Sequence, residues 1–406
     1  MSEIYNELKS RGLIKQFTTG EDKLKELLDG PSLKVYAGFD PTKNSLHVGH
    51  LIPIMILSHL QKAGHVPICV LGGGTAMIGD PSGRDSMREM LTEAKINENI
   101  TGIKKQLSHF IDFSAENALL MNNYDWLGLE NYISFIRDIG PHFTVNRMLT
   151  ADCFKIRMEK GLSFLEFNYM ILQAYDYYIL FKKYGCTLQI GGDDQWSNIL
   201  AGIDLIRRKN GAEVFGMTNP LLTRSDGKKM GKTEGGAVWL DPEMTSPYDY
   251  YQFWRNTSDD DVVRFLKIYT FVPLETISQY ENLSGQELNI AKELLAFEAV
   301  KILHGESEAL KADESAKKLF GQGSLTDAPS INLALENVIG AQLVDLCVIA
   351  GVFKTKSEVR RMIAQGGISL NGEKVTDAKK LITEGDIHKG SLVIKKGKKS
   401  FYKIEI

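Results

Sequence analysis

One stretch near the N-terminus constrains the fold more than any other part of the chain. Residues 33–39 alternate apolar and aromatic side chains as a β-strand does, and residues 40–42 end the pattern with a turn. Residues 51–63 carry apolar side chains at helical spacing, and the short apolar run 65–71 is typical of a strand buried on both faces. Strand, helix and strand in this order predict a βαβ unit with a right-handed crossover, and hence an α/β fold on a parallel sheet.

Two histidines stand between this first strand and its helix. The ring nitrogens of His47 and His50, with the free N–H groups of the helix start, can meet an anion there. Gly49 has no side chain, so a flat ring can approach its backbone closely. A zinc site would need further ligands, and none stands nearby at metal spacing. The pair alone also fits caps or partly buried packing residues, so other stretches must decide.

The overall composition narrows the class of protein. The chain has 406 residues, 43% of them hydrophobic, and a net charge of −3, which predicts a soluble protein of two or three domains. It has no run of about 18 apolar residues and no apolar signal core near its start, so we expect neither a membrane span nor secretion. Its four cysteines are widely spaced, which disfavours structural zinc and disulfides and favours a reducing cytoplasm.

The near-neutral total hides an uneven distribution of charge. Residues 342–406 hold 13 Lys and Arg against 7 Asp and Glu, a net charge of +6, so the first 341 residues carry −9. A basic end on an acidic body favours a polyanionic partner, although a solvated lysine-rich surface fits as well. Within this end, residues 356–365 predict a short helix, and residues 368–375 and 392–406 predict hairpins, the first with an Asn-Gly turn.

A glycine-rich loop follows the second strand, at residues 72–83. It matches neither the Walker A pattern nor the G-x-G-x-x-G dinucleotide pattern, so it is not assigned to either. Asp80 lies in this loop, and Arg84 and Arg88 follow it. These arginines could reach phosphates, although arginines in such positions are more often surface residues.

The second informative stretch is residues 164–184, a long helix ended by glycine. Tyr169, Gln173 and Asp176 share one face at positions i, i+4 and i+7. Buried without partners, each would cost about 1–3 kcal/mol, so three such groups on an otherwise apolar helix need partners or a ligand. A solvent-exposed face is the alternative. Residues 186–190 then form a predicted strand whose end carries Gly192, Asp194 and Gln195, where parallel α/β sheets bind ligands.

The third stretch is a loop of glycines and lysines at residues 221–236. Lys228, Lys229 and Lys232 are spaced ammonium groups between glycines, an arrangement that suits a clamp on a polyphosphate. A lysine-rich loop without a ligand is the alternative. Helical patterns follow as far as residue 320. Four segments are therefore expected: an α/β domain at 1–220 with a helical insertion at about 85–165, a helical domain at 221–320 that opens with the lysine loop, a linker at 321–341, and a small α+β domain at 342–406.

Taken together, these stretches resemble the class I aminoacyl-tRNA synthetases, and within them the bacterial enzymes specific for tyrosine. His47-Val-Gly-His50 is similar to the first signature of the family, and Lys229-Met-Gly-Lys-Thr233 is similar to the second. Gly231 and Thr233 replace two serines of the general pattern, as is usual in the tyrosine branch. The resemblance covers essentially the whole chain. It implies a doubly wound, Rossmann-like catalytic domain, a helical domain and an RNA-binding module of the ribosomal-protein S4 type.

The resemblance also implies residue roles. Tyr36 and Asp176 would hold the phenol oxygen of the substrate, and Asp80, Tyr169 and Gln173 its ammonium group, with Gln195 also lining the pocket. The nucleotide and the adenylate would be framed by Asp40, Thr42, His47, Gly49, His50, Gly192, Asp194 and Gln195. The pyrophosphate would be held by Lys229, Lys232 and Thr233, helped by Arg84 and Arg88. Ala37 stands where the family often has a cysteine beside the ribose, so one weak contact would be absent.

The implied reaction joins L-tyrosine to ATP, releasing pyrophosphate, and then passes the tyrosyl group to the 3′ end of tRNA(Tyr). Mg²⁺ would arrive on ATP and not in a site built by the protein. The resemblance implies a homodimer that meets through residues of about 130–165, and neither a membrane nor DNA is expected as a partner. Three alternatives stay open: specificity for tryptophan, a small nucleotidylyltransferase, and an RNA-binding protein with an inactive synthetase body.

Overall fold

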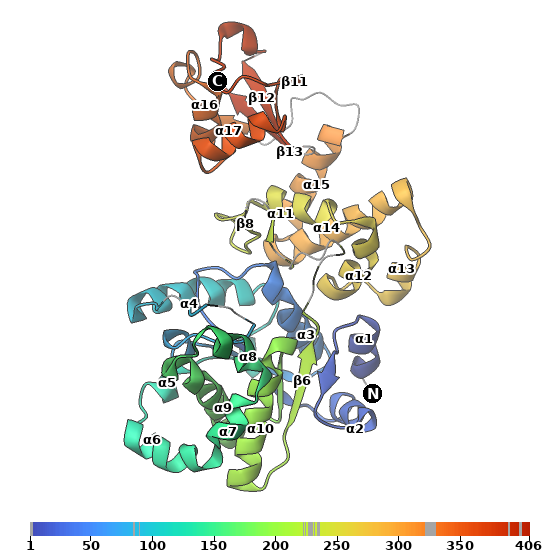
Figure 1. Ribbon diagram of the computed structural model, residues 1–406. Coiled ribbons are helices and arrows are strands. Elements are labelled where there is room, and N and C mark those ends of the chain that lie inside the picture. The colour runs from blue at the N-terminus through green and yellow to red at the C-terminus, as the bar shows by residue number, and fades with distance from the viewer. Residues whose placement is uncertain are drawn as a thin grey trace. The chain divides into compact units, whose positions relative to one another are not determined.

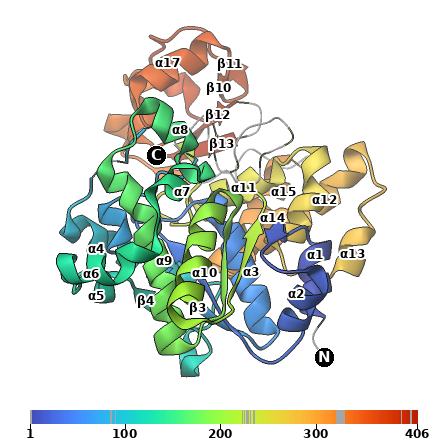
Figure 2. The ribbon, with the colours of Figure 1, turned by 60° about the horizontal axis from the view of Figure 1, so that its bottom comes forward.

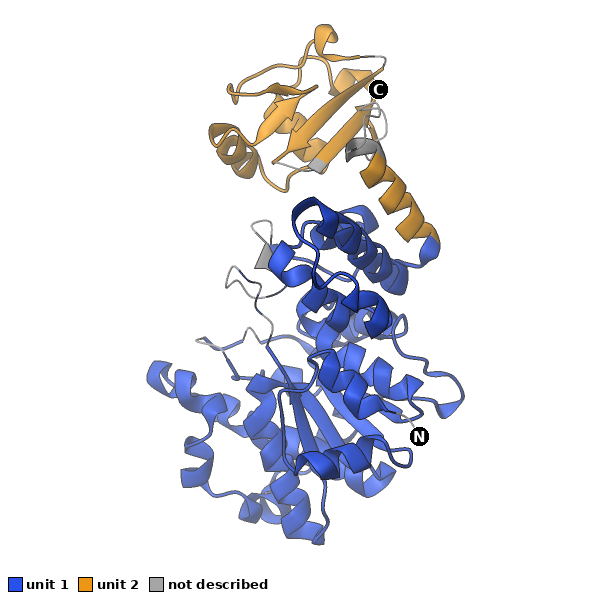
Figure 3. Ribbon diagram, turned by 90° about the vertical axis from the view of Figure 1, so that its right-hand side faces the viewer, with its two compact units in different colours: residues 1–306 blue, residues 307–406 orange. Residues whose placement is uncertain are grey.

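The computed structural model describes residues 3–83, 86–88, 90–221, 223, 225, 230, 232–233, 236–320, 330–388, 390–397 and 400–406. The side chains of residues 232, 233, 318–320 and 400 are outside this description. The chain forms two compact units, residues 1–306 and residues 307–406 (Figure 3). Each unit is built around its own sheet and is described separately.

A six-stranded sheet lies in the first unit (Figure 1). Its strands are β1 (Gln16–Phe17), β2 (Lys34–Phe39), β3 (Val66–Leu71), β4 (Leu119–Asn122), β5 (Leu188–Gly192) and β6 (Phe215–Asn219). Their order is β1-β6-β5-β2-β3-β4, and all neighbours are parallel except the edge strand β1, which is antiparallel to β6. The strands predicted at residues 33–39, 65–71 and 186–190 are confirmed, whereas β1, β4 and β6 were not predicted.

The order of the strands creates a switch point between β2 and β5. From β2 the chain moves to β3 and β4 on one side, and from β5 it moves to β6 on the other. Right-handed crossovers therefore put α3 (Leu51–Lys62), which joins β2 to β3, and α10 (Trp196–Asn210), which joins β5 to β6, on opposite faces of the sheet. This arrangement is the predicted doubly wound fold. Ligands in such folds bind at the carboxyl ends of the strands beside the switch point.

Helix α9 (Phe164–Tyr184) runs beside α10 and covers one face of the sheet (Figure 2). Tyr177 and Leu180 of α9 and Leu205 of α10 are buried in one cluster with Tyr36 and Ile68 of the strands. Burial of this apolar face contributes roughly 25 cal/mol per Å² removed from water. The helix predicted at residues 164–184 is confirmed with the same bounds.

Local signals fix both ends of α9. The side chain of Ser163 accepts a hydrogen bond from the Glu166 N–H, and the carboxylate of Glu166 accepts one from the Ser163 N–H, which makes a capping box. At the other end Gly185 adopts φ 69°, a left-handed conformation that glycine reaches without strain. The sequence therefore defines the start and the stop of the helix that carries three predicted pocket residues.

The remainder of the first unit is mainly helical. Its other helices are α1 (Ile4–Ser10), α2 (Glu21–Leu28), α4 (Glu93–Leu107), α5 (Tyr124–Leu127), α6 (Tyr132–Ile139), α7 (Val145–Leu149), α8 (Asp152–Lys160), α11 (Pro247–Arg255), α12 (Asp259–Tyr269), α13 (Leu274–Ser278) and α14 (Leu288–His304). Strand β4 interrupts the segment at about 85–165 that was expected to be a helical insertion. No helix among the described residues combines the length and the apolar character that crossing a membrane requires.

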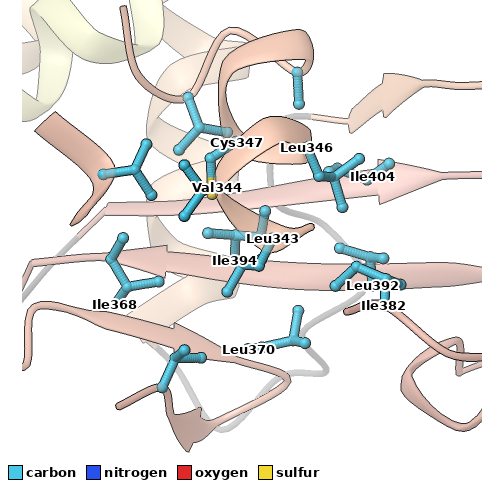
Figure 4. Packing of buried hydrophobic residues seen from close by; sticks show 14 of the residues in the cluster. Leu343, Val344, Leu346, Cys347, Ile368, Leu370, Ile382, Leu392, Ile394 and Ile404 are labelled. Atoms are coloured by element: carbon cyan, nitrogen blue, oxygen red, sulfur yellow. The ribbon is translucent and has the colours of Figure 1, made fainter. Parts of the chain in front are cut away.

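The second unit holds a five-stranded sheet ordered β11-β10-β12-β13-β9. Its elements are α15 (Glu306–Phe320), β9 (Ser330–Asn332), α16 (Leu343–Ile349), α17 (Lys356–Ala364), β10 (Ile368–Leu370), β11 (Glu373–Lys374), β12 (Ser391–Lys396) and β13 (Ser400–Glu405). Its core packs the two central helices on the strands, with Leu343, Cys347, Ile394 and Ile404 almost fully buried (Figure 4).

The predicted helix and both predicted hairpins of this unit are present. The turn between β10 and β11 has positive φ at Asn371 (49°) and Gly372 (92°), as a type I′ Asn-Gly turn requires. Strand β9 pairs in parallel with β13, although it lies within residues 321–341, where we expected a linker. Its pairing partner is more than seventy residues away, and the amino-acid composition of residues 321–341 cannot reveal a partner at that distance.

Candidate active site

Predicted pocket residues from four parts of the chain meet at the switch point. Asp40 follows β2, Asp80 lies in the loop after β3, Tyr169 lies on α9, and Gln195 ends the short 3₁₀-helix that follows β5. The Tyr169 hydroxyl donates to Asp40 Oδ2 at 3.0 Å, and Gln195 Nε2 donates to Asp80 Oδ2 at 2.7 Å. The site thus forms where the topology predicts it, from side chains up to 155 positions apart between Asp40 and Gln195.

The Asp40 carboxylate is held by two hydroxyl groups. Besides Tyr169, the Thr75 Oγ1 donates to Asp40 Oδ1 at 2.9 Å. A Cβ atom on Gly72 would lie 2.1 Å from the same oxygen, so only glycine fits at this position. Burial raises the pKa of Asp40, while the charge of Arg88 and the two hydroxyl hydrogen bonds act in the opposite direction. Thr42, two residues on, donates its backbone N–H to the Asp40 carbonyl at 2.8 Å.

The Asp176 carboxylate lies deeper in the pocket and is 4% exposed. It accepts hydrogen bonds from Trp126 Nε1 at 2.7 Å and from Asn123 Nδ2 at 2.9 Å. Burial raises the pKa of Asp176 to about 7, although both hydrogen bonds favour the ionised form. Asn123 in turn accepts from the Gly74 N–H at 2.7 Å, so the backbone of the glycine-rich loop holds the amide in place.

Asn123 and Trp126 are pocket residues that the sequence analysis missed. They lie at and just after the end of β4, a strand of four residues that was not predicted. A usable signal was present, because the apolar run of residues 118–121 is followed directly by two asparagines. Polar residues directly after a parallel strand are what the ligand-binding edge of such a sheet presents.

Two predicted pocket residues end in buried polar atoms that have no hydrogen-bond partner within the described protein. The Tyr36 hydroxyl and Gln173 Oε1 are both in this state, and Tyr36 is 1% exposed. Burial, and then the charge of the nearby Asp176, raise the pKa of Tyr36 well above its ordinary value. The Tyr36 ring packs on Tyr177, with the ring centroids 5.3 Å apart. An unpaired buried polar atom costs free energy, which a ligand that supplies the partner removes.

A third such atom belongs to a residue that the sequence analysis did not assign. Gln189 Oε1 is buried without a partner, and Gln189 pairs with Tyr36 across the parallel strands β5 and β2. Residues in register on neighbouring strands point to the same face of the sheet. Gln189 therefore belongs on the Tyr36 side of the sheet.

The Asp80 side forms a second polar group of residues. Asp80 Oδ1 accepts from the Ser82 N–H at 2.9 Å, and Arg88 Nε donates to the Asp80 carbonyl at 3.3 Å. Gln195 Nε2 also reaches Asp194 Oδ2 at 3.2 Å, and burial raises the pKa of Asp194. A Cβ atom added to Gly192 would lie 2.5 Å from Asp194 Oδ1, so a side chain at this position would clash with the Asp194 carboxylate.

The two histidines pack against each other at the start of α3, with their ring centroids 4.0 Å apart. The Gly49 N–H donates to His47 Nδ1 at 3.0 Å, and the His47 N–H donates to His50 Nδ1 at 3.2 Å. With Nδ1 as the acceptor, a neutral ring carries its proton on Nε2; the His50 Nδ1 also lies 3.3 Å from the His47 carbonyl, a contact that the other tautomer would make. Burial, and then the charge of His47, lower the pKa of His50 to about 3, so His50 is neutral near pH 7. A Cβ on Gly49 would lie 2.7 Å from the His47 ring, so the flat ring beside this glycine is the imidazole of the same loop.

Several predicted residues cannot be placed. Arg84 and Lys229 lie outside the described residues. For Lys232 and Thr233 only the backbone is described, as strand β7 (Lys232–Thr233), which pairs with β8 (Gly236–Ala237). Among the described residues, no three His, Cys, Asp or Glu side chains are arranged to hold a metal ion.

Comparison with known proteins now decides the family. Residues 29–321 match the family model described as tRNA synthetases class I (W and Y). The chain belongs to this family of class I tRNA synthetases. Residues 320–404 match a second model, described as the C-terminal domain of SYY-like tyrosine–tRNA ligases. The resemblance drawn from the two signatures is thereby confirmed.

Two full-length relatives have the same name. The chain is 54% identical to the tyrosine–tRNA ligase of Acetivibrio thermocellus, covering 100% of both proteins. It is 52% identical to the tyrosine–tRNA ligase of Clostridium perfringens strain 13, covering 100% of this chain and 99% of the relative.

Solved structures extend the comparison to the fold. A C-terminally truncated mitochondrial tyrosyl-tRNA synthetase from Aspergillus nidulans is 32% identical, with a TM-score of 0.71 over 79% of this chain and 95% of that one. The tyrosyl-tRNA synthetase of Archaeoglobus fulgidus, solved with L-tyrosine, is 19% identical, with a TM-score of 0.57 over 76% of this chain and 99% of that one. At that identity the likeness concerns the fold alone.

Proposed function

We propose that this synthetase is a tyrosine–tRNA ligase. It activates L-tyrosine with ATP to give tyrosyl-adenylate and pyrophosphate, and then transfers tyrosine to the 3′ end of tRNA(Tyr). The observation that carries the proposal is the unpaired, buried hydroxyl of Tyr36 in the electrostatic range of Asp176. The names of the full-length relatives support it independently. Translation in bacteria takes place in the cytoplasm, so the proposal includes that location.

A phenol satisfies both groups at the end of the pocket. Its O–H donates to the Asp176 carboxylate, and its oxygen accepts from the Tyr36 hydroxyl. Phenylalanine would leave both groups unpaired, which is the costly state for buried polar atoms. An indole N–H would satisfy Asp176, but it cannot accept from Tyr36, which disfavours tryptophan.

At the other end of the substrate, acceptor groups face the ammonium group. Asp80 supplies a carboxylate, the Tyr169 hydroxyl supplies an oxygen, and Gln173 Oε1 is buried without a partner. Three oxygen acceptors match the three N–H donors of an ammonium group. Binding of the free amino acid would therefore pair the second unpaired atom of the site.

The chemistry requires positioning and not a general base. An oxygen of the tyrosine carboxylate attacks the α-phosphorus of ATP, and the bond from that phosphorus to pyrophosphate breaks. The 3′-terminal ribose hydroxyl of tRNA then attacks the carbonyl carbon, its proton passes to the departing phosphate group, and AMP leaves. The Nε2–H donors of His47 and His50 are of the kind that stabilise growing charge on phosphate oxygens. Lys229, Lys232 and Thr233 are assigned to the pyrophosphate by family resemblance, and Mg²⁺ enters on the nucleotide.

A homodimer is part of the proposal. Large apolar side chains of the segment at about 130–165 are exposed, including Ile133 (70%), Val145 (57%) and Phe164 (73%). A pocket of about 190 Å³ is lined partly by the same segment, with Met148 of α7, Met170 of α9 and Leu200 of α10 among its residues. Apolar surface gathered in this way is typical of an interface between subunits. Light scattering at micromolar concentration should give twice the mass of the 45.4 kDa chain, and a monomer would contradict the proposal.

The test of the function is ATP–pyrophosphate exchange with each of the twenty amino acids. We expect exchange with tyrosine alone. Exchange stimulated by tryptophan and not by tyrosine would reassign the specificity, and no exchange with any amino acid would reject the proposal. Aminoacylation by wild-type protein at the rate of a His47→Ala variant would indicate an inactive body that only binds RNA.

A further inference from the structure

A segment on the far side of the lysine signature pairs with the histidine loop. Residues 238–241 run antiparallel to residues 45–48, and the bridge between the two segments joins His47 to Trp239. Three hydrogen bonds connect them: from the Val48 N–H to the Val238 carbonyl (3.1 Å), from the Leu240 N–H to the Leu46 carbonyl (2.9 Å), and from the Asp241 N–H to Ser45 Oγ (3.1 Å). Two segments about 190 positions apart thus form one short ribbon.

The register of this ribbon brings the two ring side chains together. The backbone hydrogen bonds flank His47 and Trp239, which makes them a non-hydrogen-bonded pair, the kind in which opposite side chains lie closest. The neighbours at residues 46, 48, 238 and 240 are buried and anchor the ribbon on its other face. The His47 and Trp239 ring centroids are 5.9 Å apart with an interplanar angle of 69°, an edge-on packing.

Three described groups contact or adjoin the His47 ring. The Gly49 N–H holds Nδ1, the His50 ring lies 4.0 Å away between centroids, and the Trp239 ring packs edge-on. A hydrogen bond to Nδ1 fixes one atom of the imidazole but allows tilting about it. The neighbouring rings restrict that tilt, and they therefore aim the Nε2–H.

We propose that Trp239 is a positioning residue for His47. Its indole fixes the direction in which the His47 Nε2–H points. The proposal rests on the proposed function, in which His47 donates to the phosphate. It concerns the ring and not the ribbon, because backbone bonds and buried aliphatic neighbours hold the ribbon without the indole.

The test is a double-mutant cycle in the full-length protein. Trp239→Leu keeps an apolar side chain and removes the aromatic packing. We expect it to lower the kcat of tyrosine-dependent pyrophosphate exchange about three- to tenfold. The tyrosine dissociation constant should stay within about twofold of wild type, because the pocket at Tyr36 and Asp176 is untouched. Trp239→Phe, which keeps an aromatic ring, should recover most of the loss.

Coupling to His47 separates positioning from a general structural effect. In a His47→Asn background, Trp239→Leu should cause no further loss, since there is no imidazole to aim. The matched control is Phe271→Leu, which removes an equally edge-on ring contact with a histidine outside the site, His59, at 5.0 Å and 62°. That variant should leave kcat unchanged.

Three results would overturn the inference. In the first, the double variant loses kcat by the product of the losses of Trp239→Leu and His47→Asn. In the second, the tyrosine dissociation constant of Trp239→Leu rises as much as its kcat falls. In the third, Trp239→Leu keeps the wild-type kcat. If Trp239→Leu does not fold, Trp239→Met carries the same cycle, because it also keeps an apolar side chain and removes the aromatic ring. Wild-type protein that shows no exchange with any amino acid would instead reject the proposed function, so the two failures are distinguishable.

Discussion

Tyr36 has a hydroxyl group that does nothing for the stability of the fold. The oxygen is buried and has no partner within the described protein, while the ring packs in the core with Tyr177. An unpaired buried hydroxyl is a cost to the folded state that a bound ligand can remove. Removing this one oxygen should therefore weaken tyrosine binding without lowering the stability of the fold.

Tyr36→Phe should raise the KM for tyrosine about tenfold, because one hydrogen bond of about 1–1.5 kcal/mol is lost. The free energy of unfolding should stay the same or rise slightly, because a buried polar atom without a partner disappears. Urea denaturation and exchange kinetics measure the two effects. Tyr177→Phe is the matched control. Its hydroxyl donates to the Phe215 carbonyl at 2.8 Å, so it should lose stability and keep the wild-type KM. A destabilised Tyr36→Phe with an unchanged KM would contradict this reading.

Asp176 makes tyrosine binding depend on pH. With a pKa of about 7, the Asp176 carboxyl group is mostly protonated below pH 7. The phenol of tyrosine donates its hydrogen bond to the ionised carboxylate. The affinity for tyrosine should therefore be constant above about pH 8 and fall as the pH drops through 7, approaching tenfold per pH unit. Calorimetric titration between pH 6 and pH 8.5 tests this, and an affinity that does not change across that range would contradict it.

The same pKa fixes the sign of the effect on stability. Between the ordinary aspartate range near pH 4 and pH 7, the folded state holds a proton at Asp176 that the unfolded state has released. The contribution of Asp176 to stability therefore falls as the pH rises from 4 to 7 and stays low above it. In the absence of tyrosine, wild-type protein should gain stability relative to an Asp176→Asn variant as the pH is lowered through 7.

Residue spacing predicted part of this site and could not predict the remainder. Tyr169, Gln173 and Asp176 were grouped correctly on one helix face, because helical periodicity is a local property. The donors that hold Asp176 come from Asn123 and Trp126, about fifty positions earlier. No local pattern encodes which strand end lies opposite a given helix. The ligand roles of the site residues remain predictions.

At the scale of elements, α9 depends on a buried ion pair just before it. Arg157 of α8 pairs with Glu166 of α9 through Nε–Oε1 at 2.8 Å and Nη2–Oε2 at 3.2 Å, and both side chains are almost fully buried. The same Glu166 caps the helix through Ser163. One carboxylate thus holds α8 and sets the start of the helix that carries the pocket.

Arg157→Met should destabilise the first unit by about 3–5 kcal/mol, because it leaves Glu166 buried without its counter-charge. The matched control is Arg207→Met, which removes an exposed ion pair with Asp204 at 2.8 Å and should change stability by less than about 1 kcal/mol. Urea denaturation measures both variants. If the two substitutions lowered the free energy of unfolding equally, the buried ion pair would not contribute more to stability than the exposed one.

Elements with strong local signals were predicted well, and short ones were missed. The capped helix α9 has helical periodicity, strand β2 alternates, and strand β3 is a continuous apolar run of six residues. Strand β4 has four residues without alternation, and the edge strand β1 has two. Such strands are defined by their neighbours in the sheet and not by their own sequence.

At the scale of the whole molecule, the point to test is where the second unit begins. The second unit has its own core, and β9 at residues 330–332 is part of its sheet. A boundary at residue 342, expected from composition, would remove β9 from that sheet. The fold class was predictable from the order of strands and helices, whereas this parallel pairing of distant segments was not.

A fragment of residues 330–406 should therefore melt at a higher temperature than a fragment of residues 342–406, because the second exposes the edge of β13. Circular dichroism melts of the two fragments test this, and equal melting temperatures would show that β9 adds nothing. The complementary deletion of residues 330–406 should leave pyrophosphate exchange intact and weaken tRNA charging. Unchanged charging at low tRNA concentration would contradict an RNA-binding role for this unit.

The central claim is that Tyr36 and Asp176 together recognise a phenol. A crystal structure of the protein with L-tyrosine tests it most directly. We expect the phenol oxygen within about 2.6–3.2 Å of both the Tyr36 hydroxyl and the Asp176 carboxylate. A bound tyrosine whose hydroxyl lies away from either group would contradict the claim.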